Sequence, residues 1–249
     1  NAVQDIDNDF VYRNIMALYL KGKYKSQTSK SYMKRIINTS FLAAMLFSIT
    51  VSLTSCNESD PVPATDLTSQ VNSLPKESLN TDEINSLTFM REEEKLARDV
   101  YVTLYAKWKI NIFNNIGESE QTHMDAVLQL LNRYNLQDPV GNNNVGEFDN
   151  ADLQELYIQL VELGSISISD ALQVGATIED LDIFDLENAL TKIDNQDIKL
   201  VYENLTKGSR NHLRSFYSNI LIAGETYTPQ FITQEKFDTI VNSPMEKGR

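Results

Sequence analysis

The chain of 249 residues contains one cysteine and two histidines, and this scarcity excludes several kinds of site. A single thiol cannot form a disulfide framework within the chain, nor a zinc or iron–sulfur site built on several thiolates. The sequence also lacks a glycine-rich phosphate loop, a G-x-S-x-G nucleophile motif, internal repeats and an apolar run of about 20 residues that could span a membrane. The chemistry of this chain therefore has to rest on carboxylates and two imidazoles.

The N-terminal region has the three-part layout of an export signal. Residues 33–35 (Met-Lys-Arg) are basic, residues 41–51 form a short apolar run, and residues 53–56 read Leu-Thr-Ser-Cys. This ending resembles a bacterial lipoprotein signal, in which cleavage precedes a cysteine that is then lipidated. The resemblance implies that Cys56 is the mature N-terminus and carries lipid; a chance buried cysteine is the alternative.

We therefore divide the chain into five segments. We expect residues 1–32 to be an over-extended N-terminus and residues 33–55 to be a lipoprotein signal peptide. Residues 56–79 contain three prolines among polar residues, which predicts a flexible tether. Residues 80–241 would be the folded domain, and residues 242–249 a tail. This division predicts a protein of the bacterial cell envelope, attached to a membrane through Cys56.

Charge separates the same segments. The first 55 residues hold seven of the 22 Lys and Arg residues and three of the 35 acidic residues, which leaves 15 basic against 32 acidic residues and a net charge of −17 from Cys56 onward. Nucleic-acid binding needs clustered Lys and Arg, so we expect no nucleic-acid partner. Anionic lipid surfaces would also repel this domain, so membrane attachment would come from the lipid.

Apolar residues recur every three or four positions through most of residues 80–241, which predicts an all-α domain. Four long helices are expected, the first beginning near Asn80 and the second ending by Asn135. The third begins near Ser169, and the fourth runs from about Asn195 to Gly224. A short helix ending at Gly164 lies in the long connection over residues 141–168, and residues 231–241 predict a short fifth helix.

Each of the four long helices places a metal-binding side chain in the middle of its apolar stripe. Glu120 and His123 are three residues apart on one face, a spacing that lets both hold one metal ion. Within the run at residues 92–94, Glu94 falls on the stripe, whereas Glu92 faces away and is expected to be solvated. The candidate ligands are Glu94, Glu120, His123, Glu179, Asp182 and His212.

Two interpretations of these residues stay open. Burying three carboxylates without cations would cost many kcal/mol, so either their pKa values rise or metals balance them. Together the candidate carboxylates Glu94, Glu120, Glu179 and Asp182 carry four negative charges, which would neutralise two divalent ions. This balance favours a site for two metals. The alternative is a polar core in which buried Glu and His side chains satisfy one another.

The order of these motifs resembles the ferritin-like di-iron superfamily. Residues 94–101 look like the first-helix segment of rubrerythrins, residues 120–123 (Glu-Gln-Thr-His) match the second-helix motif, and residues 179–182 (Glu-Asp-Leu-Asp) resemble the third-helix carboxylates. Residues 91–98 and 208–214 most resemble an uncharacterised bacterial and archaeal branch of ferritin-like proteins, a domain of unknown function. The resemblance covers about residues 81–240. It implies a ferritin-like four-helix bundle with a long crossover between helices 2 and 3, and two metal ions, iron first and manganese second.

One position departs from the family pattern. The fourth helix of the family usually carries Glu-x-x-His, whereas this chain has Ser209 three residues before His212. Asp182 could supply the missing carboxylate from the third helix; otherwise one metal position is open or weak. This departure argues against a storage role of the ferritin type and leaves room for a coordination position that faces a substrate.

The resemblance implies a lipid-anchored di-iron protein with an oxidase, peroxidase or iron-handling role, whose small partner is oxygen or peroxide. In that interpretation the protein is a di-iron oxidoreductase, and Tyr101 is either a redox neighbour of the metals or a core tyrosine. The alternatives are a non-catalytic metal-binding or metal-sensing protein and a metal-free interaction module on the same bundle. A homodimer is compatible with each.

Overall fold

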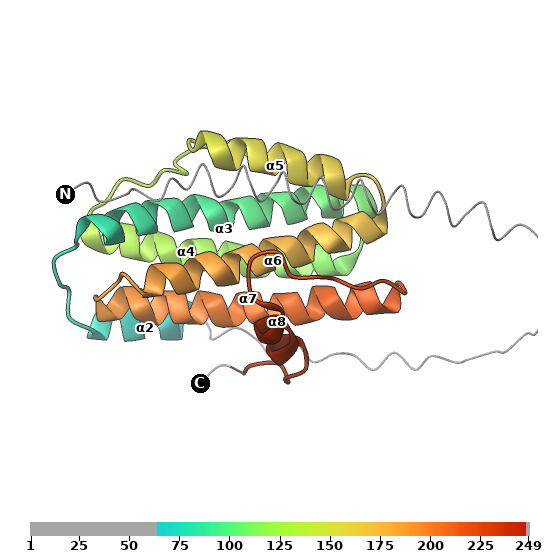
Figure 1. The fold of residues 1–249 in the computed structure, drawn as a ribbon. Helices are drawn as coiled ribbons and strands as arrows, with labels where there is room; N and C mark the ends of the chain where they lie inside the picture. Colours follow the sequence, from blue (N-terminus) through green and yellow to red (C-terminus); the bar gives the residue numbers. More distant parts are fainter. Residues whose placement is uncertain (1–63, 248–249) are drawn as a thin grey trace, which may run out of the picture. The chain divides into compact units, whose positions relative to one another are not determined.

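The computed structural model describes residues 64–247, and over this range the protein is all-α, with seven helices and no strand (Figure 1). None of these helices combines the length and the apolar character that a membrane span requires. The helices are α2 (Ala64–Ser73), α3 (Thr81–Trp108), α4 (Asn111–Tyr134), α5 (Ala151–Gly164), α6 (Ile168–Leu190), α7 (Gln196–Ile222) and α8 (Gln234–Val241).

The first long helix begins where its sequence provides a cap. The Asn80 side chain accepts a hydrogen bond from the backbone N–H of Glu83, and the Glu83 carboxylate accepts one from the N–H of Asn80, which is a capping box. The other oxygen of Glu83 accepts hydrogen bonds from the N–H groups of Asp194 and Asn195, just before α7. This buried carboxylate therefore joins the starts of α3 and α7.

The four long helices pack in two pairs. α3 lies along α4 and α6 lies along α7, and the pairs meet through contacts of α4 with α7 and of α3 with α6 (Figure 1). Only residues 109–110 separate α3 from α4, and Lys109 takes the left-handed backbone conformation that ends a helix (φ 57°). α5 covers α3 and α6. The facing stripes of α3, α4, α6 and α7 are thus held together along their lengths.

Residues 64–73 form a packed helix, so the expectation of a flexible tether over residues 56–79 is wrong there. α2 packs on α4 and α7, and its residues Leu67 and Val71, four apart on one face, join the hydrophobic core. Thr68 and Gln129 exchange two hydrogen bonds between α2 and α4. The expected N-terminal extension, signal peptide and lipidated Cys56 lie outside the described residues.

The connection between α4 and α5 is fixed by charged side chains of α3. Glu92, expected to be solvated, is instead 4% exposed, and its carboxylate accepts hydrogen bonds from the N–H groups of residues 149–150. Lys95 is fully buried, forms an ion pair with Asp99 and donates to the carbonyl of Asn144 at 2.8 Å. The expectation for Glu92 fails because this connection folds back over that face of α3.

The chain after α7 is held by a carboxylate of α6. Asp180 accepts hydrogen bonds from the N–H groups of residues 230–232 and from the hydroxyl of Tyr227 at 2.8 Å. Further on, Glu246 forms ion pairs with Arg210 and Arg214 of α7. The segment between α7 and α8 and the start of the expected tail are therefore bound to the four long helices.

Candidate metal centre

Two groups of three buried donor residues face one another in the middle of the long helices. The first comprises Glu94 from α3 with Glu120 and His123 from α4; the second comprises Glu120 from α4, Glu179 from α6 and His212 from α7. Within each group the ligand atoms all lie within 4.8 Å of one another. The two groups share Glu120, so they form one centre.

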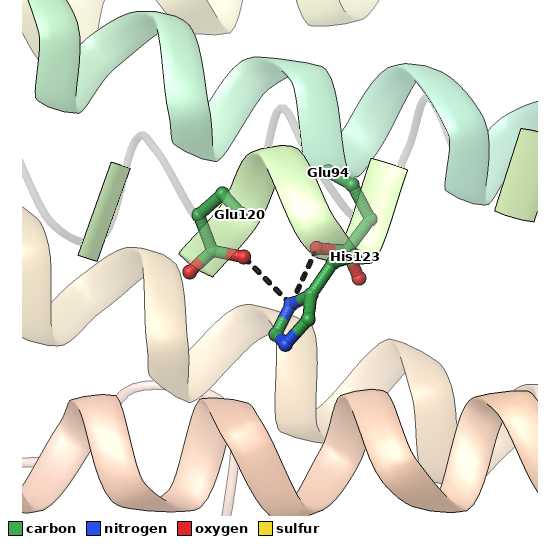
Figure 2. Close-up of side chains that lie close together, drawn as sticks. All are labelled: Glu94, Glu120 and His123. Carbon is green, nitrogen blue, oxygen red and sulfur yellow. Dashed lines mark hydrogen bonds and ion pairs between the residues drawn. The ribbon is translucent and has the colours of Figure 1, made fainter. Parts of the chain in front are cut away.

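In the first group the imidazole of His123 lies between two carboxylates (Figure 2). Its Nδ1 is 2.7 Å from Oε2 of Glu120 and 3.1 Å from Oε2 of Glu94. Glu120 and His123 share one face of α4 because they are three residues apart, and the pairing of α3 with α4 brings Glu94 to them. All three donors of this group therefore come from the first helix pair.

The second group repeats this arrangement around His212. Its Nδ1 is 2.8 Å from Oε1 of Glu120 and 3.4 Å from Oε2 of Glu179. The imidazole rings of His123 and His212 are stacked, with centroids 5.5 Å apart. The two oxygens of Glu120 thus face different histidines, one in each group.

Several buried atoms of the centre make no hydrogen bond with the protein. They include Oε1 of Glu94, both carboxylate oxygens of Glu120, Oε2 of Glu179 and Nδ1 of His212. Glu120 and His212 approach within 2.8 Å, yet these atoms are not aligned for a hydrogen bond with each other. Metal-ligand atoms that lie close together without hydrogen bonds to one another have this geometry, and a cation between them would satisfy them. The residues present therefore fit a metal ion in each group.

Neighbouring residues orient the donors. The Tyr101 hydroxyl, fully buried, donates to Oε1 of Glu179 at 2.5 Å, so the other oxygen of Glu179 is left to face His212. Oγ of Ser119 lies 2.9 Å from Nε2 of His212, which fixes the ring with Nδ1 toward the carboxylates. On the opposite imidazole, Nε2 of His123 lies against the backbone of Gly208, where a Cβ atom would come within 2.5 Å of it.

Burial and proximity shift the pKa values of these groups in opposite directions. Burial raises the pKa of Glu94 to about 7, although His123 opposes the shift. Burial would also raise the pKa of Glu120, but the two imidazoles hold it well below its usual range. Burial lowers the pKa of His212, but Glu120 and Glu179 outweigh it and raise the pKa to about 9. Without a metal, the imidazole of His212 therefore holds a proton that a metal ion has to displace.

Five of the six residues selected from the sequence meet in these groups, and Asp182 does not. It is 2% exposed and one turn along α6 from Glu179, but it belongs to neither group, and its Oδ2 makes no hydrogen bond. Burial, followed by repulsion from Glu179, raises the pKa of Asp182 well above its usual value. Ser209 is buried, and its hydroxyl donates to the carbonyl of Leu205 in its own helix at 3.1 Å.

Ser119 was not singled out by the sequence, because a serine between two glutamates has no distinctive periodicity. Gly208 gave no signal of its own either, since a glycine inside a helix has many causes. Both act through packing between α4 and α7, which their local sequence does not encode.

The chain is similar to proteins whose roles are not described. A family model with the description "Uncharacterized protein domain (DUF2202)" matches residues 83–244, a range that contains every donor of the two groups. The "Uncharacterized protein MJ0754" of the archaeon Methanocaldococcus jannaschii is 58% identical over 178 residues, which cover 72% of this chain and 96% of that protein. A crystal structure of hypothetical protein MJ0754 from Methanococcus jannaschii DSM 2661 matches with a TM-score of 0.69 and 58% identity, over 70% of this chain and 99% of that one.

Proposed function

The chain belongs to the family of the uncharacterised protein domain DUF2202, and from that premise we propose that it is a ferritin-like protein that binds two metal ions in one carboxylate centre. The observation that supports this most directly is the position of Glu120. Its two oxygens face different histidines at 2.7 and 2.8 Å, and each histidine has its own further carboxylate. A shared carboxylate of this kind is characteristic of centres with two metals in helix bundles.

The donor set favours iron, with manganese as the second choice. Carboxylates and imidazoles without thiolates suit first-row divalent ions of intermediate hardness. Glu94 and His123 would hold one ion, Glu179 and His212 the other, and Glu120 would contact both. Iron held there would supply one-electron redox chemistry toward oxygen or peroxide, and we propose that the protein is an oxidoreductase of this type or handles iron.

The chain's own residues would support that chemistry by position and by exclusion of water. The five donors are at most 8% exposed, so bulk water has little access to them. The hydroxyl of Tyr101 donates to the Glu179 oxygen that does not face His212, and this hydrogen bond fixes which oxygen is available for a metal. The ring of Tyr101 also packs in a cluster with the rings of Phe113 and Phe216. We therefore assign Tyr101 a positioning role.

A non-catalytic metal-binding or metal-sensing role is the second candidate. The observation that favours it is α7, which contributes a single donor, His212, while the Ser209 hydroxyl is bonded back to its own helix. Metal retained by the protein without consumption of oxygen or peroxide would support this role. A metal-free interaction module would instead melt identically before and after chelation.

We also propose that the protein is exported and anchored through lipid on Cys56. This part rests on the sequence of residues 33–56 alone, because those residues lie outside the range that the structure describes. The relative named above is archaeal, so it gives no support to a bacterial lipoprotein signal. Incorporation of a labelled fatty acid that is lost in Cys56→Ser would support the anchor, and unlabelled wild-type protein would exclude it.

The test of the proposed function is the metal content per chain. The full chain is produced in iron-supplemented medium and analysed for metals alongside Glu94→Ala, His123→Ala and, as a control, Glu118→Ala, which is exposed on α4. We expect about two irons per chain in the wild type and the control, and a loss in the other two variants. Oxygen and peroxide consumption would then be measured on the loaded protein. No metal in the wild type, with a melt unaffected by either substitution, would refute the proposal.

A further inference from the structure

One end of the four long helices exposes large apolar side chains that no described segment covers. They are Ile166 and Ile168 around the start of α6, and Leu221 and Ile222 at the end of α7. These four residues, which we call the apolar end, are between 45% and 82% exposed. α6 and α7 lie side by side, and Gln173 of α6 donates to the carbonyl of Thr226 just after α7, so the two segments are neighbours (right side of Figure 1). Exposed apolar patches of this kind mark contact surfaces.

Aromatic and basic side chains lie beside the apolar end. The indole of Trp108, the last residue of α3, donates to the carbonyl of Gly164 at 2.8 Å, which places the end of α3 beside the connection from α5 to α6. Nζ of the exposed Lys107 lies 5.3 Å from the ring centroid of Trp108, and Nζ of the exposed Lys109 lies 5.2 Å from that of Tyr105. Within the described part of the chain neither lysine forms an ion pair. An apolar surface with Trp and Lys at its edge is typical of proteins at a membrane–water interface.

Charge distinguishes this end from the rest of the domain. The segments that meet there, residues 105–112, 161–170 and 219–226, hold two lysines and three acidic residues, a net charge of −1. The chain from Cys56 onward carries −17, so almost all of the negative charge lies elsewhere. Anionic lipid headgroups therefore repel the rest of the domain far more than this end, where two exposed lysines can contact phosphate groups.

We propose that the apolar end lies against a phospholipid surface, with its four apolar side chains in the interfacial region and Lys107 and Lys109 at the headgroups. This inference goes beyond the proposed function, because it requires neither metal ions nor a lipid on Cys56. A second copy of the chain fits less well, since a symmetric end-to-end contact would bring the lysines of both copies together. Fourteen residues of α3 separate Glu94 from Trp108, so the candidate metal centre would lie about 21 Å from the lipid surface.

The experiment uses the single tryptophan of the chain, Trp108, whose fluorescence reports contact of this end with lipid. The full chain is mixed with vesicles of phosphatidylcholine and phosphatidylglycerol that carry either plain or brominated acyl chains, because bromine quenches a tryptophan only at close range. We expect brominated vesicles to quench the wild type and, equally, the control Ile84→Glu, since Ile84 is 38% exposed at the opposite end of α3. Ile222→Glu should weaken vesicle binding about tenfold or more, and Lys107→Gln combined with Lys109→Gln by a similar factor.

Three results would overturn the inference. The first is a wild type whose Trp108 is not quenched by brominated vesicles. The second is equal quenching in Ile222→Glu, which would be the result if lipid were contacted only through the apolar run at residues 41–51, present in every variant. The third is a wild-type dimer that is lost in Ile222→Glu without quenching by lipid, which would assign this end to a second copy. Where Ile222→Glu lacks a cooperative melt, Ile166→Glu takes its place. Metal content does not enter the measurement, so its failure leaves the proposed function standing.

Discussion

Gly208 gives a sharp test of how tightly the centre is held, because its backbone lies directly against the outer side of His123. A Cβ at this position would lie 2.5 Å from Nε2 of His123 and 2.6 Å from Cε1. Gly117, in α4, is the matched control, because a Cβ there would meet only the Cβ of Tyr101 at 3.5 Å, an ordinary contact. Both glycines lie inside helices, so Gly→Ala changes the helix propensity equally at the two sites.

The structure sets the expected magnitudes. Gly117→Ala should stabilise the metal-free protein by about 0.5–1 kcal/mol, the usual gain of alanine over glycine in a helix. Gly208→Ala gains the same amount but adds an overlap that costs about 1–3 kcal/mol. We therefore expect the free energy of unfolding of Gly208→Ala to lie about 1–3 kcal/mol below that of Gly117→Ala, measured by urea denaturation.

The affinity of the centre for metal should respond to the same overlap. To restore an ordinary contact the His123 ring has to retreat from 2.5 to about 3.4 Å, a displacement of about 0.9 Å. Metal sites tolerate about 0.5 Å, so Gly208→Ala should weaken one metal position by about 10- to 100-fold in a chelator competition, while Gly117→Ala leaves it unchanged. Equal stabilisation of both variants, with unchanged metal affinity, would refute the packing argument.

Three further predictions follow from individual contacts. The pKa of His212 is raised from 6.5 to about 9 in the folded chain, so its contribution to metal-free stability is full below pH 6.5 and is lost as the pH rises through 9. Urea midpoints from pH 6 to 10 should fall accordingly, and a flat profile would contradict this. Tyr101→Phe removes the donor to Oε1 of Glu179 and should cost about 1–3 kcal/mol of stability; a change below about 0.5 kcal/mol would show that the hydrogen bond is not formed in solution. Asp180→Asn should cost a similar amount and speed proteolysis within residues 225–233, whereas an unchanged cleavage rate would mean that this carboxylate does not hold the segment.

Local sequence signals predicted the helices well where the chain carries its own caps. The start of α3 at Asn80 was expected from the capping residue and the acidic first turn, and both halves of the capping box are present. The start of α6 was expected near Ser169, but Ser167 is the N-cap and its side chain accepts from the N–H of Asp170. Two serines so close together provide the same local signal, and packing decides between them.

Features that depend on tertiary contacts could not be predicted in this way. α2 has a polar composition with three prolines around or near it, and its two core residues, Leu67 and Val71, are too few for a periodic signal. The burial of Glu92 depends on a connection more than 50 residues away in sequence, which donates two backbone N–H groups to it. The local sequence therefore indicates neither the packing of α2 nor the burial of Glu92.

The candidate site follows the same division. Spacing on one helix predicts that Glu120 and His123 share a face, because the helical period is fixed. It cannot predict which oxygen of Glu120 faces which histidine, nor that Asp182, on the same face of α6 as Glu179, stays outside both groups. Those outcomes depend on the rotation of each helix against its neighbours, which is set by packing.

The division of the donors between the helix pairs also bears on the order in which the centre is made. Glu94, Glu120 and His123 all lie in α3 and α4, so the first set of donors is complete in a nascent chain once residue 134 has left the ribosome. The second set waits for Glu179 and His212, which follow in α6 and α7. During synthesis the first set, including the shared Glu120, is therefore available before the residues that complete the second set have been made.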